Sequence, residues 1–247
     1  MKRLLLLSIT VAILVSGCAM TEATKKKATY HYQMGVSYLG EGDPTKALIE
    51  FTDAEKYTPD DPELLYYLGK TYVLKKRPDL AEPKFQRAIE LRPNYSEAKN
   101  ELGVMYLQMK RWDDAYRLFM EVTEDLFYLH PEYAQVNMGV ALLGKGDTVR
   151  ALNILRTAAI NYPQFPPARL YLGRVYAATE KIELAIAEYR AAIDIFNDYA
   201  DAHFHLALAY MKKGENRSAT ASFREVVRIA PDSELGRLSR EYLDVLN

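Results

Sequence analysis

Four histidines and one cysteine carry the most reactive side chains of this chain. The histidines are His31, His130, His203 and His205. His203 and His205 are two positions apart in a segment expected to be helical, so their side chains point about 200° apart and do not suit a single metal ion. The acidic residues fall at expected helix caps and on exposed helix faces, and their spacing specifies no pair. We therefore expect no catalytic residues, no enzymatic activity, no metal site and no cofactor.

One stretch imitates a phosphate-binding loop. Gly139, Gly144 and Lys145 have the spacing with which such a loop begins. Gly146, however, stands where a serine or threonine is required. The stretch also falls in an expected helix and turn, whereas a phosphate-binding loop follows a strand. We therefore reject this motif and expect no small-molecule substrate.

The single cysteine, Cys18, ends an apolar segment that follows a basic start. Residues 4–15 are apolar except for Ser8 and Thr10, a run with the length of a signal-peptide core that is too short to span a bilayer comfortably. It leads into Val15-Ser16-Gly17-Cys18, which resembles the bacterial lipobox of an aliphatic residue, two small residues and a cysteine. The alternative is an ordinary cleaved signal, or a membrane anchor, with a coincidental cysteine.

The lipobox resemblance implies a specific chemistry at Cys18. Diacylglycerol would be attached to the thiol as a thioether, residues 1–17 would be removed as a signal peptide, and the new amino group would be acylated. Several acyl chains hold a protein stably on a membrane. Ala19 follows the cysteine, and a residue other than aspartate favours, by the same resemblance, the periplasmic face of a bacterial outer membrane. Residues 18–27 are polar and are expected to form a lipidated tether.

Composition limits the class of protein. The chain has 247 residues, of which 49% are hydrophobic and 26% charged, with a formal net charge of −1. These values exclude disorder as the dominant state. A near-neutral charge gives no electrostatic reason to expect nucleic acid. With one cysteine, an intrachain disulfide is excluded.

The segment from Pro62 to Pro93 carries small and large residues at fixed offsets. They are Leu68, Gly69, Tyr72, Ala81, Phe85, Ala88 and Pro93. This set resembles the 34-residue tetratricopeptide repeat, in which two antiparallel helices pack with small residues at their crossing point. One such pair cannot bury its own apolar face, so further copies are expected on both sides.

Copies of the pattern recur along the chain. The expected repeats are residues 28–61, 62–95, 96–131, 132–165, 166–199 and 200–231, followed by a capping helix over 232–247. The predicted fold is all-α, a right-handed superhelical solenoid of six helix pairs closed by that helix. Asp43 and Asp61, each before a proline, are expected to cap helices, and Gly42, Gly146 and Gly214 are expected in the turns within pairs.

An irregular segment separates the third and fourth repeats. It contains Phe127, Tyr128 and Leu129 in a connection two residues longer than the others. These side chains either mark a partner site or fill a gap left by a changed angle between repeats. The sequence leaves both interpretations open.

In tetratricopeptide repeats the first helix of each pair lines a concave groove, and the resemblance assigns groove positions to this chain. We expect about half of them to be simple core. The positions are Tyr32, Val36, Leu39, Tyr66, Lys70, Val73, Asn100, Val104, Leu107, Tyr133, Val136, Val140, Leu170, Arg174, Phe204 and Leu208. The set is mostly apolar, which fits an apolar or amphipathic segment of a protein partner better than an acidic chain terminus.

A lipobox, a short tether and six tetratricopeptide repeats together resemble the pilotin lipoproteins of type IV pilus systems. The resemblance implies a non-enzymatic scaffold that helps secretin subunits reach the outer membrane and assemble there, with a secretin subunit as the partner and the membrane contacted through the lipid. The alternatives are an adaptor for cell-wall hydrolases or for β-barrel assembly, and a hydrolase with an unrecognised site.

Overall fold

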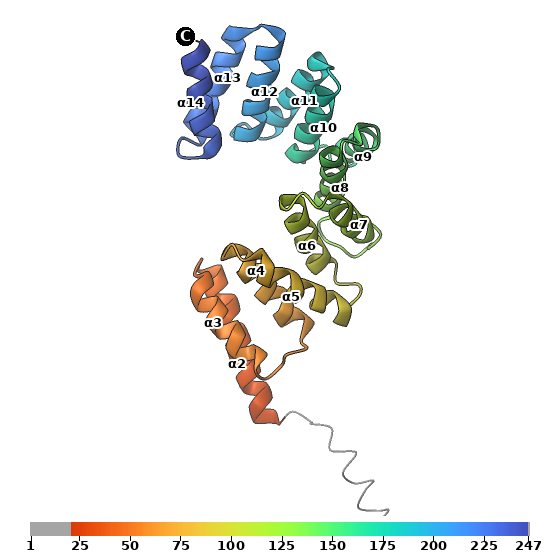
Figure 1. The fold of residues 1–247 in the computed structure, drawn as a ribbon, viewed down its shortest axis with the longest axis vertical. Helices are drawn as coiled ribbons and strands as arrows, with labels where there is room; N and C mark the ends of the chain where they lie inside the picture. The colour runs from red at the N-terminus through yellow and green to blue at the C-terminus, as the bar shows by residue number, and fades with distance from the viewer. Residues whose placement is uncertain (1–20, 247) are drawn as a thin grey trace, which may run out of the picture. The chain divides into compact units, whose positions relative to one another are not determined.

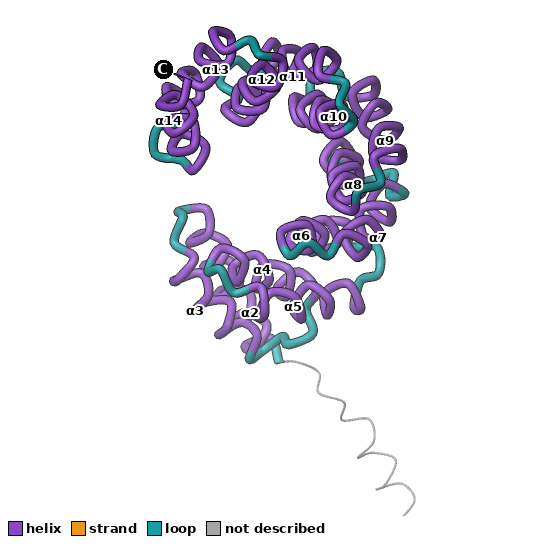
Figure 2. The backbone as a smooth tube through the Cα atoms, turned by 45° about the horizontal axis from the view of Figure 1, so that its top comes forward, coloured by secondary structure: helices purple, strands orange, loops and turns teal. Residues whose placement is uncertain are grey.

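The structure is a computed structural model, which describes residues 21–246. This range consists entirely of helices joined by short loops (Figures 1 and 2). Thirteen helices, α2 to α14, follow one another in this part of the chain. The all-helical fold of consecutive packed pairs is therefore confirmed. The expected signal peptide and Cys18 lie outside the described residues. Among the described helices, we find none with both the length and the apolar character needed to cross a membrane.

The helices alternate as first and second members of pairs. Their bounds are α2 Glu22–Gly40, α3 Pro44–Glu55, α4 Pro62–Leu74, α5 Pro78–Leu91, α6 Ser96–Gln108, α7 Trp112–Thr123, α8 Pro131–Lys145, α9 Thr148–Asn161, α10 Pro166–Ala178, α11 Ile182–Ile195, α12 Ala200–Lys213, α13 Asn216–Ile229 and α14 Glu234–Leu246. They form two compact units, α2 to α5 and α6 to α14, which divide between Tyr95 and Ser96. Each unit is described by itself below.

Glycine allows the two helices of a pair to approach closely. A Cβ atom on Gly69 of α4 would lie 2.6 Å from the Phe85 ring on α5, and one on Gly103 of α6 would lie 2.8 Å from the Phe119 ring on α7. Nonbonded carbon atoms prefer a separation of about 3.5–4.0 Å. The aromatic rings are fully buried and occupy the space that any larger residue would need.

Alanines complete this packing on the second helices. Ala47, Ala81, Ala115, Ala151, Ala185 and Ala219 are all fully buried. They occur once in each pair, at the position that the repeat pattern predicts for a small residue. Because a closely packed interior cannot absorb extra volume, these positions fix how near the helices of a pair lie.

Each turn within a pair contains one residue in the left-handed region of the backbone. The residues are Gly42, Lys76, Lys110, Gly146, Glu180 and Gly214, with φ between 57° and 87°. The glycines expected in turns are therefore confirmed there. In the other three pairs Lys and Glu adopt the same conformation, which shows that the geometry of the pair dominates the preference of the individual residue.

The helix caps are mostly as expected. Asp43 accepts hydrogen bonds from the backbone of Thr45 and Lys46, and Asp61 accepts from Glu63 and Leu64. At the last helix, α14, the Ser233 hydroxyl accepts a hydrogen bond from the Gly236 backbone at 3.0 Å.

The predicted tether is too long. Helix α2 begins at Glu22, six residues before the predicted start of the first repeat at Ala28. The Thr21 side chain caps it by accepting from the Thr24 backbone at 3.2 Å, and Glu22 lies near the positive end of the helix dipole. The polar character of residues 18–27, which lack an apolar period, predicts a linker, but the alanines and lysines in this segment are good helix formers.

The apolar stripe of α14 covers the end of the second unit. Leu235, Leu238, Tyr242, Leu243 and Leu246 pack against its core. The Tyr242 ring stacks on Phe223, with ring centroids 4.9 Å apart and an interplanar angle of 4°. A final helix with one apolar face satisfies the need of a repeat array for a polar outer end.

The close approach at Gly69 yields a stability prediction. Gly69→Ala should lower the free energy of unfolding by about 1–3 kcal/mol, because the new Cβ forces Phe85 out of its position. Gly40→Ala is the matched control, since Gly40 lies on an exposed helix end with no atom near the added Cβ. Urea unfolding of the two variants measures the difference. Equal stabilities would show that Gly69 is not needed for packing.

Candidate functional site

The expected groove residues of the first unit are half-buried. Tyr32, Val36 and Leu39 on α2 pack against the core of that unit. The Tyr32 ring contacts Tyr67 edge-on, with centroids 5.7 Å apart. Burial, and next the charge of Glu63, which also accepts a hydrogen bond from the phenol, raise the pKa of Tyr32. These residues support the helix pair and expose only part of their surface.

The second set in this unit lies on α4. The Tyr66 ring lies 5.2 Å from that of Tyr95, and the Lys70 ammonium lies 5.3 Å from the centre of the Tyr66 ring. Lys70 and Val73 are half-buried. Within residues 21–95 the Lys70 charge contacts this aromatic face and pairs with no carboxylate, so it remains available to an anionic or carbonyl group of a partner.

In the second unit the first helices of the pairs lie along one side. Figure 2 shows α6, α8, α10 and α12 on the inner side, with α7, α9, α11 and α13 outside them. Successive first helices are in contact, α6 with α8, α8 with α10 and α10 with α12. Any continuous surface for a partner on this side must therefore come from these four helices.

Three of the expected groove residues are core instead. Val136, Leu170 and Phe204 are 2%, 3% and 7% exposed. They occupy the same position in successive repeats and belong to the hydrophobic core of the second unit. Their assignment to a partner surface is therefore wrong. Three of the sixteen expected groove positions are thus buried, fewer than the expected half.

The other inner positions keep part of their surface. Asn100, Val104, Leu107, Val140, Arg174 and Leu208 are half-buried, and Tyr133 is 49% exposed. The side-chain oxygen of Asn100 is buried without a hydrogen-bond partner, which is costly unless another group supplies a donor. An apolar strip with an amide and a cation is thus present on α6, α8, α10 and α12.

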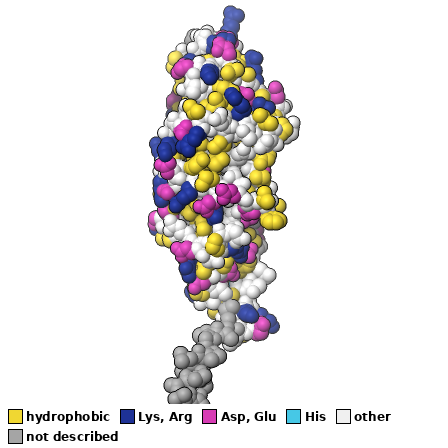
Figure 3. Space-filling view, turned by 90° about the vertical axis from the view of Figure 1, so that its right-hand side faces the viewer, with side chains coloured by type: hydrophobic (Ala, Val, Ile, Leu, Met, Phe, Trp, Pro, Cys, Tyr) yellow, Lys and Arg dark blue, Asp and Glu magenta, His cyan; other side chains and the backbone are white. Residues whose placement is uncertain are grey.

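Arg174 differs from most charged residues of this unit. Lys99 pairs with Glu121 at 2.6 Å, and Arg169 with Glu188 at 3.0 Å. Arg174 instead lies over the Tyr171 ring, 5.0 Å from its centre, and within residues 96–246 it pairs with no carboxylate. Acidic and basic side chains are interspersed among hydrophobic ones on the face drawn in Figure 3, so charge of one sign does not mark a site there.

A half-buried histidine, His205, lies close to Arg174. His205 stacks on Tyr189, with ring centroids 5.8 Å apart and an interplanar angle of 23°. Burial, and next the Arg174 charge, lower the pKa of His205 from 6.5 to about 4. Burial also raises the pKa of Tyr189 to about 12. Both rings therefore stay neutral, and we interpret them as support for Arg174, not as acid–base groups.

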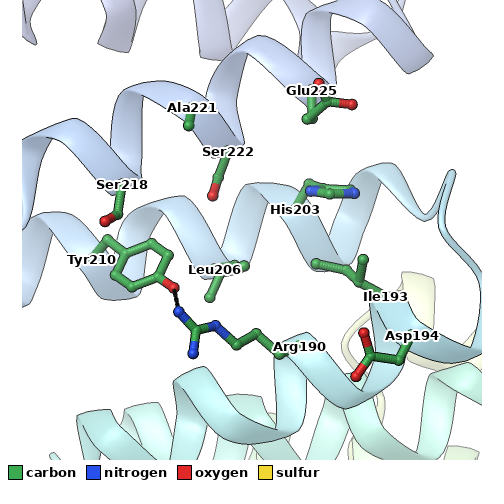
Figure 4. A pocket seen from close by; sticks show the side chains of 10 residues that line it. All are labelled: Arg190, Ile193, Asp194, His203, Leu206, Tyr210, Ser218, Ala221, Ser222 and Glu225. Carbon is green, nitrogen blue, oxygen red and sulfur yellow. Dashed lines mark hydrogen bonds between the residues drawn. The ribbon is translucent and has the colours of Figure 1, made fainter.

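A depression on the outer side of the second unit was not predicted from the sequence. It has a volume of about 550 Å³ and lies among α11, α12 and α13 (Figure 4). Its lining comprises Arg190, Ile193, Asp194, His203, Leu206, Tyr210, Ser218, Ala221, Ser222 and Glu225. Short side chains at Ser218, Ala221 and Ser222 open it, and their spacing on one face of α13 is the signal that could have indicated it.

A bond between repeats crosses this depression. The Arg190 guanidinium donates to the Tyr210 hydroxyl, as Figure 4 shows. One repeat earlier, Arg156 donates to Tyr176 at 3.3 Å. The recurrence at the repeat spacing identifies the Arg190 bond as part of the stacking of repeats, so its guanidinium does not define a ligand site.

The irregular connection between α7 and α8 does not fill a gap. Leu126, Phe127 and Leu129 are 93%, 91% and 80% exposed, whereas Tyr128 is half-buried. Of the two interpretations left open by the sequence, gap filling is therefore wrong for Phe127 and Leu129. No group of three or more His, Cys, Asp and Glu side chains in the described range 21–246 is arranged to hold a metal ion.

Comparison with protein-family models gives several matches. Residues 32–96, 76–122 and 200–233 match the tetratricopeptide repeat, and residues 173–214 match the TPR repeat. Together these matches cover more than half of the chain. Proteins built from this repeat generally provide surfaces for protein–protein interaction.

Curated proteins show distant similarity. The chain is 22% identical over 219 residues to DnaJ homolog subfamily C member 3 of Rattus norvegicus, covering 82% of this chain and 43% of that protein. It is 24% identical over 115 residues to the type IV pilus assembly protein PilF of Pseudomonas aeruginosa, covering 46% of this chain and 45% of that protein. The chain thus spans less than half the length of these relatives in each match.

Solved structures match over a greater length. The crystal structure of PilW, described as a widely conserved type IV pilus biogenesis factor, gives a TM-score of 0.75 at 21% identity, covering 85% of this chain and 97% of PilW. Pseudomonas aeruginosa PilF gives 0.70 at 16% identity, covering 89% and 99%. At such identities the likeness shows a common fold.

The half-buried His205 gives a pH prediction. Because the pKa of His205 is lowered to about 4, the unfolded chain binds a proton between about pH 6.5 and pH 4 that the folded chain does not bind. Stability should therefore fall as the pH drops through this window, by at most about 1.4 kcal/mol per pH unit.

The matched variant is His205→Phe, which keeps a ring against Tyr189 and removes the titrating group. The stability of the natural chain relative to this variant, measured by urea unfolding, should decline from about pH 7 to about pH 4.5. A constant difference across the window would show that His205 titrates as an exposed histidine does.

Proposed function

Because the chain belongs to the tetratricopeptide-repeat family, we propose that it is a lipid-anchored periplasmic scaffold that assists secretin assembly in a bacterial outer membrane during type IV pilus biogenesis. The observation that carries this proposal is the PilW match, in which the folds correspond over 85% of this chain and 97% of that protein. PilW and PilF are matched over nearly their whole length and over 85% and 89% of this chain, with TM-scores of 0.75 and 0.70.

The anchor is the second part of the proposal. Cys18, the only cysteine, ends a sequence that resembles a lipobox, and α2 begins at Glu22, only four positions later. With a lipid on Cys18, an extended connection of this length reaches about 14 Å at most. The folded repeats would therefore stay close to the inner leaflet of the outer membrane, with Lys25 to Lys27 near its headgroups.

The partner surface is the third part. On the first helices of the second unit, Val104, Leu107, Val140 and Leu208 leave a half-buried apolar strip, and Asn100 and Arg174 add an amide oxygen without a donor and a cation without a carboxylate. An extended or helical secretin segment could cover the strip and offer backbone C=O groups to Arg174, whereas the Asn100 oxygen is buried beneath the surface. The groove thus supports a protein partner more than an enzyme substrate.

The proposal is tested by deleting the gene and by restoring it with variants. Deletion should reduce secretin multimers in the outer membrane, and the natural chain should restore them. Cys18→Ser should express but fail to restore them, because the scaffold would no longer be held at the bilayer. Val104→Ser on the inner side of α6 should restore fewer multimers than Val149→Ser, the same change at an exposed residue of the outer helix α9.

Secretin multimers that remain at their natural level after deletion would overturn this function. Co-purification of cell-wall hydrolases or β-barrel assembly subunits, with no secretin present, would favour an adaptor of one of those kinds.

A further inference from the structure

The connection between α7 and α8 presents three bulky apolar side chains to solvent. Leu126, Phe127 and Leu129, here called the apolar tip, are 93%, 91% and 80% exposed. Most of the other exposed large hydrophobic residues of the described chain, such as Val149 and Val245, lie on helices, and Met109 and Phe196 directly follow helix ends. Scattered exposed residues of that kind are ordinary on soluble proteins, whereas a contiguous group marks an interaction surface.

The tip is held in place by its own backbone and by Asp125. The Asp125 carboxylate accepts from the Ser96 hydroxyl at 2.5 Å and from the Phe127 backbone N–H at 2.9 Å. The Tyr128 N–H donates to the Asp125 carbonyl at 3.2 Å. Hydrogen bonds from Ser96 and then Phe127 hold the pKa of Asp125 below its usual range. The exposure of Phe127 is thus built into an ordered turn.

Tyr128 and His130 tie the far side of the turn to α8. Tyr128 is half-buried, and its ring meets His130 edge-on with centroids 6.3 Å apart. His130 in turn contacts Tyr133 at 6.0 Å. The alternation of exposed Phe127, half-buried Tyr128 and exposed Leu129 keeps the apolar tip outward. Preorganisation of this kind reduces the entropy that binding would otherwise cost.

Acidic groups surround the tip. Burial, and then the charges of Glu97, Glu101 and Glu132, raise the pKa of Tyr128 to about 12, which places these carboxylates near its phenol. Glu124 is exposed next to the tip in the chain. The charge of Lys99 acts on Asp125 but is itself paired with Glu121 at 2.6 Å, and His130 lies 3.5 Å from Glu132. Residues 118–144, which contain the tip, include Glu121, Glu124, Asp125 and Glu132 but no lysine or arginine. The segment that carries the tip therefore has a local excess of negative charge.

The charge decides between the possible occupants. An anionic bilayer repels a site bordered by carboxylates. A second copy of this chain would bring the same acidic border against itself. A protein pocket with an apolar floor and a basic rim matches both the apolar tip and the acidic residues around it. The apolar side chains would contact the floor of the pocket, and the carboxylates would pair with its rim.

We propose that the apolar tip is a docking site for a partner protein whose surface has an apolar pocket bordered by lysines and arginines. Phe127 is the central anchor, with Leu126 and Leu129 beside it. Glu124 and the carboxylates near Tyr128 select the charge of the rim. This site is separate from the inner strip of α6, α8, α10 and α12, and does not depend on the identity of the partner proposed there.

The test uses the full-length chain and two synthetic amphipathic helical peptides with the same leucine face. One peptide carries lysines on its polar face and the other carries glutamates. In fluorescence anisotropy the lysine peptide should bind at least about tenfold more tightly than the glutamate peptide. Phe127→Ser with Leu129→Ser should weaken the lysine peptide by about tenfold, because it removes the apolar anchors.

The matched control is Val149→Ser with Ile160→Ser on α9, two side chains that are 71% and 70% exposed. It should keep the affinity of the natural chain. Circular dichroism should give the same melting temperature for both double variants, since all four side chains are exposed. Equal weakening by both variants, or equal binding of the two peptides, would overturn the proposal.

Two further assays separate the other occupants. Co-sedimentation with vesicles of phosphatidylcholine, alone or mixed with phosphatidylglycerol, should not depend on Phe127 and Leu129. Sedimentation velocity should give the same oligomeric state for the natural chain and the tip variant. Tip-dependent vesicle binding would assign the site to lipid, and tip-dependent self-association would assign it to a second copy, so either result rejects the proposal. The secretin assay is unaffected by these outcomes.

Discussion

The close contact between a glycine on the first helix and a large side chain on the second is the constraint on which five of the six helix pairs depend. The large side chain is an aromatic ring in four of them and Leu155 in the other, and in the sixth pair Ala207 takes the place of the glycine. At Gly69 and Gly173 an added Cβ would lie 2.6 Å from Phe85 and Tyr189 respectively. This contact sets the distance between the helices, and the buried alanines preserve it along the pair. Because every pair solves the same packing problem, adjoining pairs stack with a common geometry, and stability is shared among neighbours.

That packing determines what remains for function. The residues that match the repeat consensus are buried in contacts within and between pairs. A partner can therefore contact only the exposed residues at the positions between them. On the first helices of the second unit, Val104, Leu107 and Leu208 remain partly exposed. The Asn100 side-chain oxygen has no hydrogen-bond partner, and the Arg174 guanidinium lies over the Tyr171 ring. The apolar tip arises differently, since it sits in the one connection that departs from the repeat length and is free of those packing demands.

Most of the fold could be predicted because the repeat signal is local. The small residues, the capping aspartates and the turn glycines each act within one helix pair, so sequence spacing reveals them. The spacing of residues in the sequence does not reveal the contacts between different helix pairs. The burial of Leu170 and Phe204, the Arg190–Tyr210 bond and the exposure of Phe127 all depend on neighbouring elements. The start of α2 was missed because its stabilising features are a cap and helix propensity, not an apolar period.

The central claim is that the inner side of the first helices holds a secretin segment at the membrane. The most direct measurement places a photoreactive amino acid at Val104 on the inner side, or at Ile160 on the outer side, in cells that assemble pili. We expect a crosslinked product with the secretin subunit from position 104, and little or none from position 160. Equal crosslinking from both positions, or a position 104 product that lacks secretin, would contradict it.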